Sequence, residues 1–303
     1  MIFVVGKSEH TPKARALGAE LRECRIEAGL TQHELAARIG VSHVSISRYE
    51  TGTRSPRPED AAQLLATLGV AGQRYSELVE LARGAEQSNW LETGVNGLRR
   101  ELMTVIEFER IATRIVDVET NIVPGLLQTA DYARAIMGEV PGADLEARVA
   151  LRVGRAAILN RKGAPNLVAI VSEVALRQRI GGAEVMVDQL RHLLKAAELP
   201  NVTIIVLPAV SERWHPAHAG AFILFEFPKG DPIVHLEHFA SGAFLHAKEV
   251  AAYRRAVDTL QEVAMDEETS ARLIATISDE LEGTCRIERY QSDGENPVTP
   301  GTR

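Results

Sequence analysis

The chain has 303 residues, of which 45% are hydrophobic and 25% are charged. These values are typical of soluble globular proteins, and the length favours two domains. No apolar run reaches the roughly 18 residues of a membrane-spanning helix, and the apolar residues at the start are too few for a signal peptide. We therefore expect a cytoplasmic protein with no membrane segment. Cys24 and Cys285 have no spacing typical of a disulfide framework or a zinc site.

The net charge of −7 arises entirely in the second part of the chain. Residues 1–90 hold 11 Lys or Arg and 11 Asp or Glu, whereas the remaining residues hold 23 and 30. Between Arg38 and Pro58 the balance is basic, because four arginines oppose the single acid Glu50. A polyanionic partner would therefore bind near the front of the chain.

Two short helices separated by a tight turn are predicted between Thr31 and Glu50. Thr31 can cap the first helix, and Glu34, three residues later, completes a capping box. Gly40 lies where that helix must end, since glycine adopts a positive φ without a Cβ penalty. Ser42 then caps a second helix that ends at Glu50. This spacing predicts a helix-turn-helix, the second helix of which enters the major groove of DNA.

Apolar residues at helical spacing indicate a bundle around this motif. A helix before the motif ends at Gly29, a fourth helix ends at Gly69, and a fifth spans about Tyr75 to Arg83. Within the motif, the residues expected to face the core are Leu35, Ile39, Val41, Ile46 and Tyr49.

Residues 15–83 resemble the XRE class of helix-turn-helix domains, which includes the phage repressors and Cro proteins. The likeness rests on Ala36 and Gly40 at the fifth and ninth positions from Gln32, together with the apolar positions of the motif. We predict an all-α, five-helix, phage repressor-like domain over residues 15–83. An N-terminal arm of residues 1–14 precedes it, and a linker of residues 84–96 follows.

The face of the second motif helix provides a model of DNA contacts. By resemblance, the residues expected to touch base edges are His43, Val44, Ser47 and Arg48. An arginine can donate two bonds to guanine, whereas a valine contacts only a thymine methyl group. The side chains expected to bond to phosphates are Thr31, Gln32, Ser45, Arg54 and Arg57. With so few basic contacts a monomer would bind weakly, so a homodimer on double-stranded DNA is expected.

The second domain, residues 97–282, is expected to be α+β or α/β with a small mixed sheet. Leu98 to Ile115 and Ala143 to Leu159 have helical patterns, and two helices close the domain at about Lys248 to Val263 and Glu268 to Leu281. A helix between the first two strands suggests a β-α-β crossover leading into a meander. Strands are predicted at Asn166–Ser172, Val202–Leu207, Ala221–Phe227 and Ile233–Phe239. Residues 283–303 are predicted to be a disordered tail.

This second region is similar to the uncharacterised domain that follows an XRE helix-turn-helix in many actinobacterial regulators, sometimes described as antitoxin-like. The likeness is carried by segments such as Val123–Thr129 with Tyr132–Ala135, and Asn201–Val202 with Val206–Pro208. The resemblance implies a small acidic partner protein encoded nearby. The chain departs from the family at Ser211–Pro216. Candidate partner or ligand residues are Leu127, Gln128, Tyr132, Arg134, Arg148, Arg152 and Arg155.

Metal binding and catalysis are weaker hypotheses. His215 and His218 could chelate a metal, but they have no evident third ligand, and His235 and His238 point to opposite sides of a strand. His235 and Glu237 share a strand face, for which a partly exposed strand is the simpler interpretation. No nucleophile elbow, P-loop or dinucleotide-binding motif is present. We therefore expect no enzyme, no cofactor and no metal.

The leading hypothesis is a transcriptional regulator, acting as a repressor, that is controlled through its C-terminal domain by a small protein partner. One alternative is a regulator gated by a small molecule, bound between the sheet and the helix after Val123–Thr129. A second alternative is an antitoxin that regulates its own operon. In each case the protein would associate with the nucleoid when bound to DNA.

Overall fold

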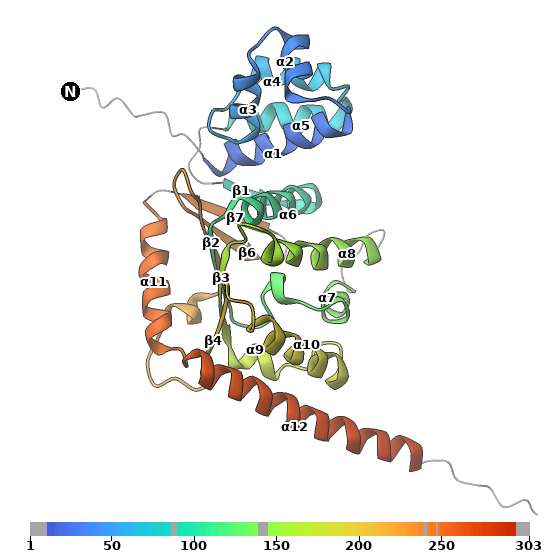
Figure 1. Ribbon diagram of the computed structural model, residues 1–303, viewed down its shortest axis with the longest axis vertical. Helices are drawn as coiled ribbons and strands as arrows, with labels where there is room; N and C mark the ends of the chain where they lie inside the picture. The colour runs from blue at the N-terminus through green and yellow to red at the C-terminus, as the bar shows by residue number, and fades with distance from the viewer. Residues whose placement is uncertain (1–10, 86–89, 139–144, 239–240, 247, 295–303) are drawn as a thin grey trace, which may run out of the picture. The chain divides into compact units, whose positions relative to one another are not determined.

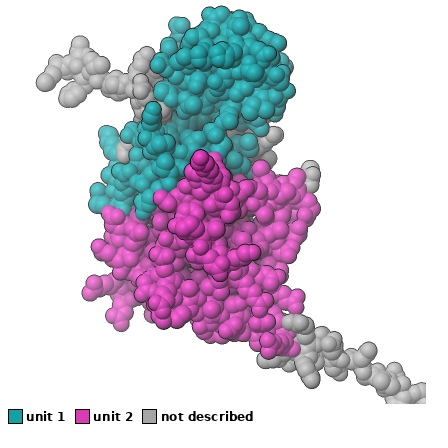
Figure 2. Space-filling view, viewed as in Figure 1, with its two compact units in different colours: residues 1–115, 222–255 teal, residues 116–221, 256–303 magenta. Residues whose placement is uncertain are grey.

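A computed structural model describes residues 11–85, 90–138, 145–238, 241–246 and 248–294. Most of the predicted arm, residues 86–89 of the predicted linker and residues 295–303 of the predicted tail lie outside this range. The chain divides into two compact units (Figure 2), the first formed by residues 1–115 and 222–255, and the second by residues 116–221 and 256–303. None of the described helices is both long and apolar enough to cross a membrane.

The predicted five-helix domain is confirmed (Figure 1). Its core is made of leucines and other apolar side chains from all five helices, among them Leu17, Leu35 and Ile46, which are almost completely buried. Burial of such side chains is the main source of stability in a small helical domain. The five helices are α1 (Pro12–Glu27), α2 (Gln32–Ile39), α3 (His43–Glu50), α4 (Pro58–Thr67) and α5 (Gly72–Arg83).

The predicted caps of the helix-turn-helix are also present. Thr31 and Glu34 form a capping box at the start of α2, and Gly40 ends that helix with a φ of +72°. Ser42 caps α3 by accepting a hydrogen bond from the backbone N–H of Ser45. One core expectation is wrong, because Val41 is 38% exposed. It follows the left-handed glycine within the turn, where the chain has left the helix surface that faces the core.

The rest of the chain contains a mixed sheet of seven strands in the order β1-β7-β6-β5-β2-β3-β4. The β-α-β crossover is confirmed, since β3 and β4 are parallel and flank a helix in sequence. The meander is confirmed in part, because β5 and β6 pair antiparallel and β6 also pairs with the unpredicted β7, whereas β2 and β3 separate β4 from it. The strands are β1 (Trp90–Thr93), β2 (Arg114–Glu119), β3 (Asn166–Ser172), β4 (Val202–Leu207), β5 (Phe222–Glu226), β6 (Ile233–His238) and β7 (Ser241–His246).

Three of these strands were not expected from the sequence. Leu98 to Ile115 was predicted to be one helix, but α6 (Gly94–Ile111) ends earlier and β2 begins at Arg114. The four central residues of β2 are buried, so it has no polar alternation that would distinguish a strand from a buried helix segment. The strand β1 lies inside the predicted linker and pairs antiparallel with β7.

The predicted helices of the second region are present. Short 3₁₀ segments at Gly125–Leu127, Ala156–Asn160 and Pro216–Ala219 accompany them. In Figure 1, α7 and α10 lie on the same side of β3 and β4. The helices are α7 (Ala130–Met137), α8 (Leu145–Arg155), α9 (Glu173–Arg177), α10 (Ala183–Ala196), α11 (Val250–Val263) and α12 (Glu267–Gly294).

The disordered tail was predicted to start at residue 283, which is too early, because α12 continues to Gly294. Cys285 is buried within this extension, and Glu282 and Arg286 form an ion pair one helical turn apart. Such contacts stabilise a helix whose sequence is otherwise polar. The other cysteine, Cys24, is also buried, which raises the pKa of its thiol to about 11.

Candidate nucleic-acid interface

The residues predicted to touch bases lie together on the outer face of α3. His43, Val44 and Arg48 are exposed, and Ser47 is partly exposed. Val44 is 43% exposed, so its methyl groups are accessible for the contact with a thymine methyl group that was expected of it. The opposite face, with Ile46 and Tyr49, is buried. This short helix therefore has a buried face that packs on the domain core and an exposed face that carries the predicted base contacts.

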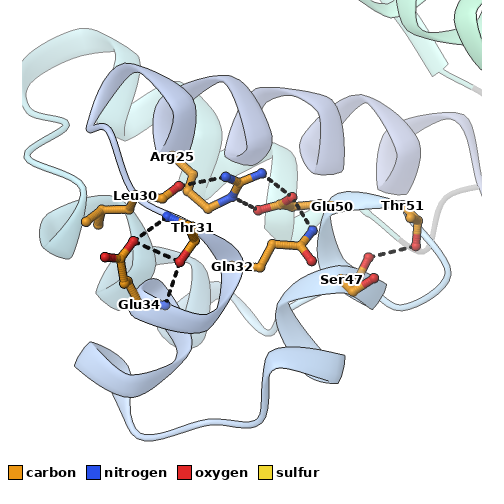
Figure 3. Close-up of polar contacts among 8 residues, drawn as sticks. All are labelled: Arg25, Leu30, Thr31, Gln32, Glu34, Ser47, Glu50 and Thr51. Atoms are coloured by element: carbon orange, nitrogen blue, oxygen red, sulfur yellow. Dashed lines mark hydrogen bonds and ion pairs between the residues drawn. The ribbon is translucent and has the colours of Figure 1, made fainter.

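A buried ion pair fixes the C-terminal end of α3 (Figure 3). The carboxylate of Glu50 is 5% exposed as a residue and accepts hydrogen bonds from Arg25 on α1, at 2.6 Å from Nε and 3.0 Å from Nη2. Arg25 also donates from Nη1 to the carbonyl oxygen of Leu30 at 2.7 Å. The hydrogen bond to Glu50 raises the pKa of the Arg25 guanidinium. A two-point contact of this kind restricts the orientation of α3 relative to α1.

The side chain of Gln32, predicted to contact phosphate, also joins this network. Its Nε2 donates to Oε2 of Glu50 at 2.8 Å, so the first residue of α2 is bonded to the last residue of α3. The network was missed at the sequence level, where Glu50 was read as a lone acid among arginines. An acid at the end of a helix expected to bind a polyanion is itself a signal that a buried cation lies nearby.

The backbone of α3 lies directly against α1 at Gly18. A side-chain carbon at this position would overlap the carbonyl oxygen of Tyr49 and would lie 2.7 Å from the carbonyl oxygen of Glu50. Only glycine permits this approach without a displacement of one helix. The position of α3 therefore depends on backbone contact as well as on the ion pair.

The predicted phosphate contacts Thr31 and Ser45 both take part in the caps of the motif helices, Thr31 as the cap of α2 and Ser45 as the bonded partner of the cap Ser42. The Thr31 hydroxyl accepts a hydrogen bond from the backbone N–H of Glu34 and donates to Oε2 of Glu34 at 2.8 Å. Because the backbone N–H of Thr31 also donates to this carboxylate, the pKa of Glu34 is lowered. Ser45, at the start of α3, lies with its hydroxyl 2.9 Å from that of Ser42. The predicted phosphate contacts of Thr31 and Ser45 remain predictions.

The loop after α3 presents the other two predicted phosphate contacts. Arg54 and Arg57 are exposed. The backbone N–H of Arg54 donates to the carbonyl oxygen of Arg48 at 3.2 Å, which keeps the loop close to the end of α3. Arg57 donates from Nε to Asp60 at 3.3 Å, and such an exposed pair is weak enough to be exchanged for a phosphate.

A stacked pair of histidines connects the two motif helices. The rings of His33 on α2 and His43 on α3 have centroids 4.3 Å apart and are inclined by 22°. Both side chains are exposed. His33 was not among the predicted contacts, and nothing in its spacing marks it, because stacking depends on how the two helices cross. The contact orients His43 on the outer face of α3.

The predicted ligand residues around Val123–Thr129 are buried in the second unit. Leu127, Gln128 and Tyr132 are each at most 2% exposed. Gln128 donates to the carbonyl oxygen of Val123 at 2.7 Å, and the Tyr132 hydroxyl accepts a hydrogen bond from the Val123 N–H at 3.1 Å. Burial raises the pKa of Tyr132. These side chains hold the segment in place and present no surface to a partner in this structure.

The predicted arginine candidates have different surroundings. Arg134 is partly exposed and bonds to Glu146, at 2.7 Å from its Nε, and to Asp131. On α8, Arg148 and Arg152 are half-buried and Arg155 is 9% exposed. The guanidinium groups of Arg152 and Arg155 point toward Gly125. The three arginines of α8 are therefore not equally accessible to a partner, because the helix packs with Arg155 on its inward side.

The histidines considered as metal ligands have other contacts. The rings of His215 and His218 are stacked with centroids 3.8 Å apart, and Nδ1 of His218 accepts from the backbone N–H of His215. His235 is buried, with Nε2 2.6 Å from Oε1 of Glu101, while Glu237 is exposed. Within the described ranges, no three His, Cys, Asp or Glu side chains are grouped as metal ligands would be.

Comparison with known proteins agrees with this arrangement. Residues 16–78 match a family model described as a helix-turn-helix domain. Residues 102–276, more than half of the chain, match a model described as a domain of unknown function (DUF5753). This protein belongs to the DUF5753 family. The resemblance inferred from the sequence, a helix-turn-helix followed by an uncharacterised domain, is thereby confirmed.

This DUF5753 protein is also similar to a solved structure described as the clp gene regulator ClgR from C. glutamicum. The two are 30% identical over 26% of this chain and 96% of that chain, with a TM-score of 0.21. No curated protein matches the sequence. The helix-turn-helix match and the geometry of α2 and α3 support a DNA-binding transcriptional regulator. Neither family description names a catalytic activity.

Proposed function

We propose that this protein is a sequence-specific transcriptional regulator, acting as a repressor, that reads DNA with the outer face of α3. The observation that carries the proposal is the contrast within that helix. Its outer residues, from His43 to Arg48, are accessible, while its end is held by Arg25, Glu50 and the backbone at Gly18. Such a helix can enter the major groove without losing its support.

Each outer residue has a role in this proposal. Arg48 donates to O6 and N7 of a guanine, and Val44 contacts a thymine methyl group. His43 and Ser47 contact neighbouring base edges. Phosphate contacts that set the register come from Thr31, Gln32, Ser45, Arg54 and Arg57.

A homodimer is part of the proposal because one helix-turn-helix offers few contacts. Two copies would place two α3 helices in half-sites about 34–36 Å apart on one side of the DNA. We place dimerisation in the region after α5 and the complex on the nucleoid in the cytoplasm. Binding over a promoter would exclude polymerase, which gives repression. Sedimentation velocity with and without DNA measures the stoichiometry.

Control by a small protein partner is supported by an exposed loop after β4. Val210 and Trp214 are 86% and 73% exposed, and tryptophan commonly anchors protein interfaces. The loop coincides with Ser211–Pro216, where the sequence departs from the family pattern. Co-purification from the native host, followed by mass spectrometry, tests this role. We expect a small protein to accompany the wild type and to be lost from Trp214→Ala.

The DNA proposal is tested first by selecting genomic fragments that the full-length protein binds. A shared motif among the fragments supports sequence-specific reading. On the selected site, we expect Arg48→Ala to lower affinity by about tenfold or more and to relax preference at one base pair. Gln32→Ala should weaken binding to all sequences alike, through its phosphate contact or its bond to Glu50.

The matched control is Arg83→Ala, which removes an exposed arginine of α5 that pairs only with the exposed side chain of Glu80 among the described ion pairs. It should leave affinity and base preference unchanged. Arg54→Ala should reduce the slope of log affinity against log salt by about 0.9 if the side chain touches one phosphate. Wild-type binding by Arg48→Ala and Gln32→Ala together would contradict the assignment of α3 as the reading helix.

A further inference from the structure

A groove of about 410 Å³ lies within the first unit, between α1, the end of α5 and α6. This volume is in the range of small-molecule sites. Its floor is formed by apolar or small side chains, including Ala16 and Ala19 of α1, Leu81 of α5, and Met103 and Ile106 of α6. Ile26, at the C-terminal end of α1, is 59% exposed beside it. The groove is therefore a mainly apolar surface open to solvent.

The charged side chains that line the groove are predominantly acidic. Four glutamates face two arginines, a formal balance of −2; they are Glu20, Glu23, Glu27, Glu107, Arg22 and Arg110. Glu107 and Arg110 pair with each other. One further cation, Arg74, is shared among the three α1 glutamates, at 2.9 to 3.2 Å. Counting Arg74, the charge around the groove is still −1, so it favours a cation.

The wall formed by α1 is the same helix that supports the recognition helix. Arg25 forms the ion pair with Glu50 at the end of α3. It is the neighbour in sequence of Ile26, which lines the groove. Gly18, between the lining residues Ala16 and Ala19, lies against the backbone of Tyr49 and Glu50. A molecule in the groove would therefore contact one side of α1 while α3 rests on another. Packed helices transmit small shifts because their interiors are dense.

We propose that this groove binds an apolar small molecule carrying one positive charge, and that its occupancy changes the affinity of α3 for DNA. The apolar body would lie on Ala19, Leu81 and Ile106. The cationic group would lie at the rim beside the α1 glutamates. The binding site stands independently of the proposed DNA function, whereas the coupling rests on it.

A pair of matched probes tests the site. Tetraphenylphosphonium and tetraphenylborate have nearly the same size and apolar surface but opposite charge. Isothermal titration calorimetry of the full-length protein, without DNA, should show saturable binding of tetraphenylphosphonium at one site. Tetraphenylborate should bind at least about tenfold more weakly. No saturable binding of the cation, or equal binding of both ions, would overturn the proposal.

Variants locate the probe. Ala19→Phe fills the groove from α1, and Met103→Trp fills it from α6, so one of them serves if the other fails to fold. Either should abolish binding of tetraphenylphosphonium. Ala252→Phe places the same ring on an exposed position of α11, outside the lining, and should bind as the wild type does. Glu23→Gln with Glu27→Gln should weaken cation binding by about fivefold or more and strengthen binding of the borate. Retained binding in both filled variants would place the probe elsewhere and overturn the site.

Coupling is measured on the selected DNA fragment with and without saturating tetraphenylphosphonium. We expect a change of at least about threefold in DNA affinity, and the same factor in probe affinity when DNA is bound, since linkage is reciprocal. The change should vanish in Ala19→Phe. Probe binding with no effect on DNA affinity would overturn the coupling. A protein that binds the probe but no DNA would instead refute the proposed function and leave the site standing.

Discussion

The outer face of α3 and the segment from Val123 to Tyr132 look alike in sequence but differ in the structure. Both place polar residues next to a predicted helix start, and both were candidate contact surfaces. On α3, Arg48 and its neighbours are exposed. In the other segment, Gln128 and Tyr132 are buried and bonded to the backbone of Val123.

The difference teaches how to interpret polar residues in a motif. A polar side chain that is short of partners in its own chain is available to bind another molecule. One that satisfies buried backbone groups contributes to stability instead. The DNA-binding region combines both kinds, since Gln32, Glu50 and Arg25 are bonded internally behind the exposed residues of α3. Measurements of the free energy of unfolding can distinguish the internally bonded side chains from the exposed ones.

The largest effect is expected at the buried end of α3. Glu50→Ala removes the carboxylate that pairs with Arg25 and bonds to Gln32, and should lower the free energy of unfolding by about 3 kcal/mol. Arg48→Ala, on the exposed face of the same helix, should change it by less than about 0.5 kcal/mol. Urea denaturation followed by circular dichroism measures both. Equal losses would contradict the division of α3 into a supported and a reading side.

The next effect is expected in the buried segment. Gln189 of α10 is fully buried, accepts a hydrogen bond from the Thr129 N–H at 2.8 Å and donates to the Leu127 carbonyl oxygen at 2.8 Å. Gln189→Ala leaves both backbone groups without this partner and should cost about 2 kcal/mol. Gln178→Ala, an exposed control, should cost less than about 0.5 kcal/mol. If Gln189→Ala left the free energy of unfolding unchanged in denaturant titrations, the structural role given to this segment would be contradicted.

A smaller effect is expected at the cap of α2. Thr31→Ala removes the hydroxyl that bonds to Glu34 and should lower stability by about 1 kcal/mol. Thr67→Ala is the control, because its hydroxyl bonds to the Gln63 carbonyl oxygen within α4 and caps no helix start. Thermal unfolding should separate the two variants. If Thr67→Ala lowered stability as much as Thr31→Ala does, the loss could not be attributed to the capping box.

The smallest effect depends on pH and concerns Glu173, which is only partly exposed. Its carboxylate accepts from the Ala209 N–H at 3.0 Å and from Arg177 at 2.7 Å, and the backbone hydrogen bond in particular lowers its pKa. The stability it contributes is therefore present above the ordinary glutamate pKa of about 4.3 and is lost as pH falls through the lowered value.

The comparison is between the wild type and Glu173→Gln. The wild type should have the higher melting temperature at pH 7, and the gap should close toward pH 3. A gap that did not depend on pH would mean that the contribution of Glu173 is not that of its charged form.

Most of the DNA-binding domain could be predicted because its signals are local. Thr31 with Glu34, Gly40 and Ser42 each specify a helix end within four residues, and the structure contains all three features. The candidate reading face on this helix was assigned by resemblance to the XRE class. The ion pair between Arg25 and Glu50 could not be predicted in this way, because its partners are brought together only when α1 packs on α3.

The second region was predicted less completely because strand pairing is non-local. The strand β2 resembles a continuation of α6 in sequence, since its run of buried residues, Ile115 to Val118, has no distinguishing period. The short β1 is a strand through its pairing with β7, about 150 residues later in the chain. The burial of Gln128 and Tyr132 depends likewise on α10, through Gln189, and no local pattern shows it.

Gly18 has a consequence for engineering. Because α3 lies with its backbone against this glycine, the outer side chains can be exchanged without altering the surface on which the helix rests. Libraries that vary only positions 43, 44, 47 and 48 would keep Ile46, Tyr49 and Glu50. The contacts that hold α3 in the domain would then be retained. Under the proposed function, exchanging these four side chains would change the DNA sequence that is bound, provided that position 18 is left as glycine.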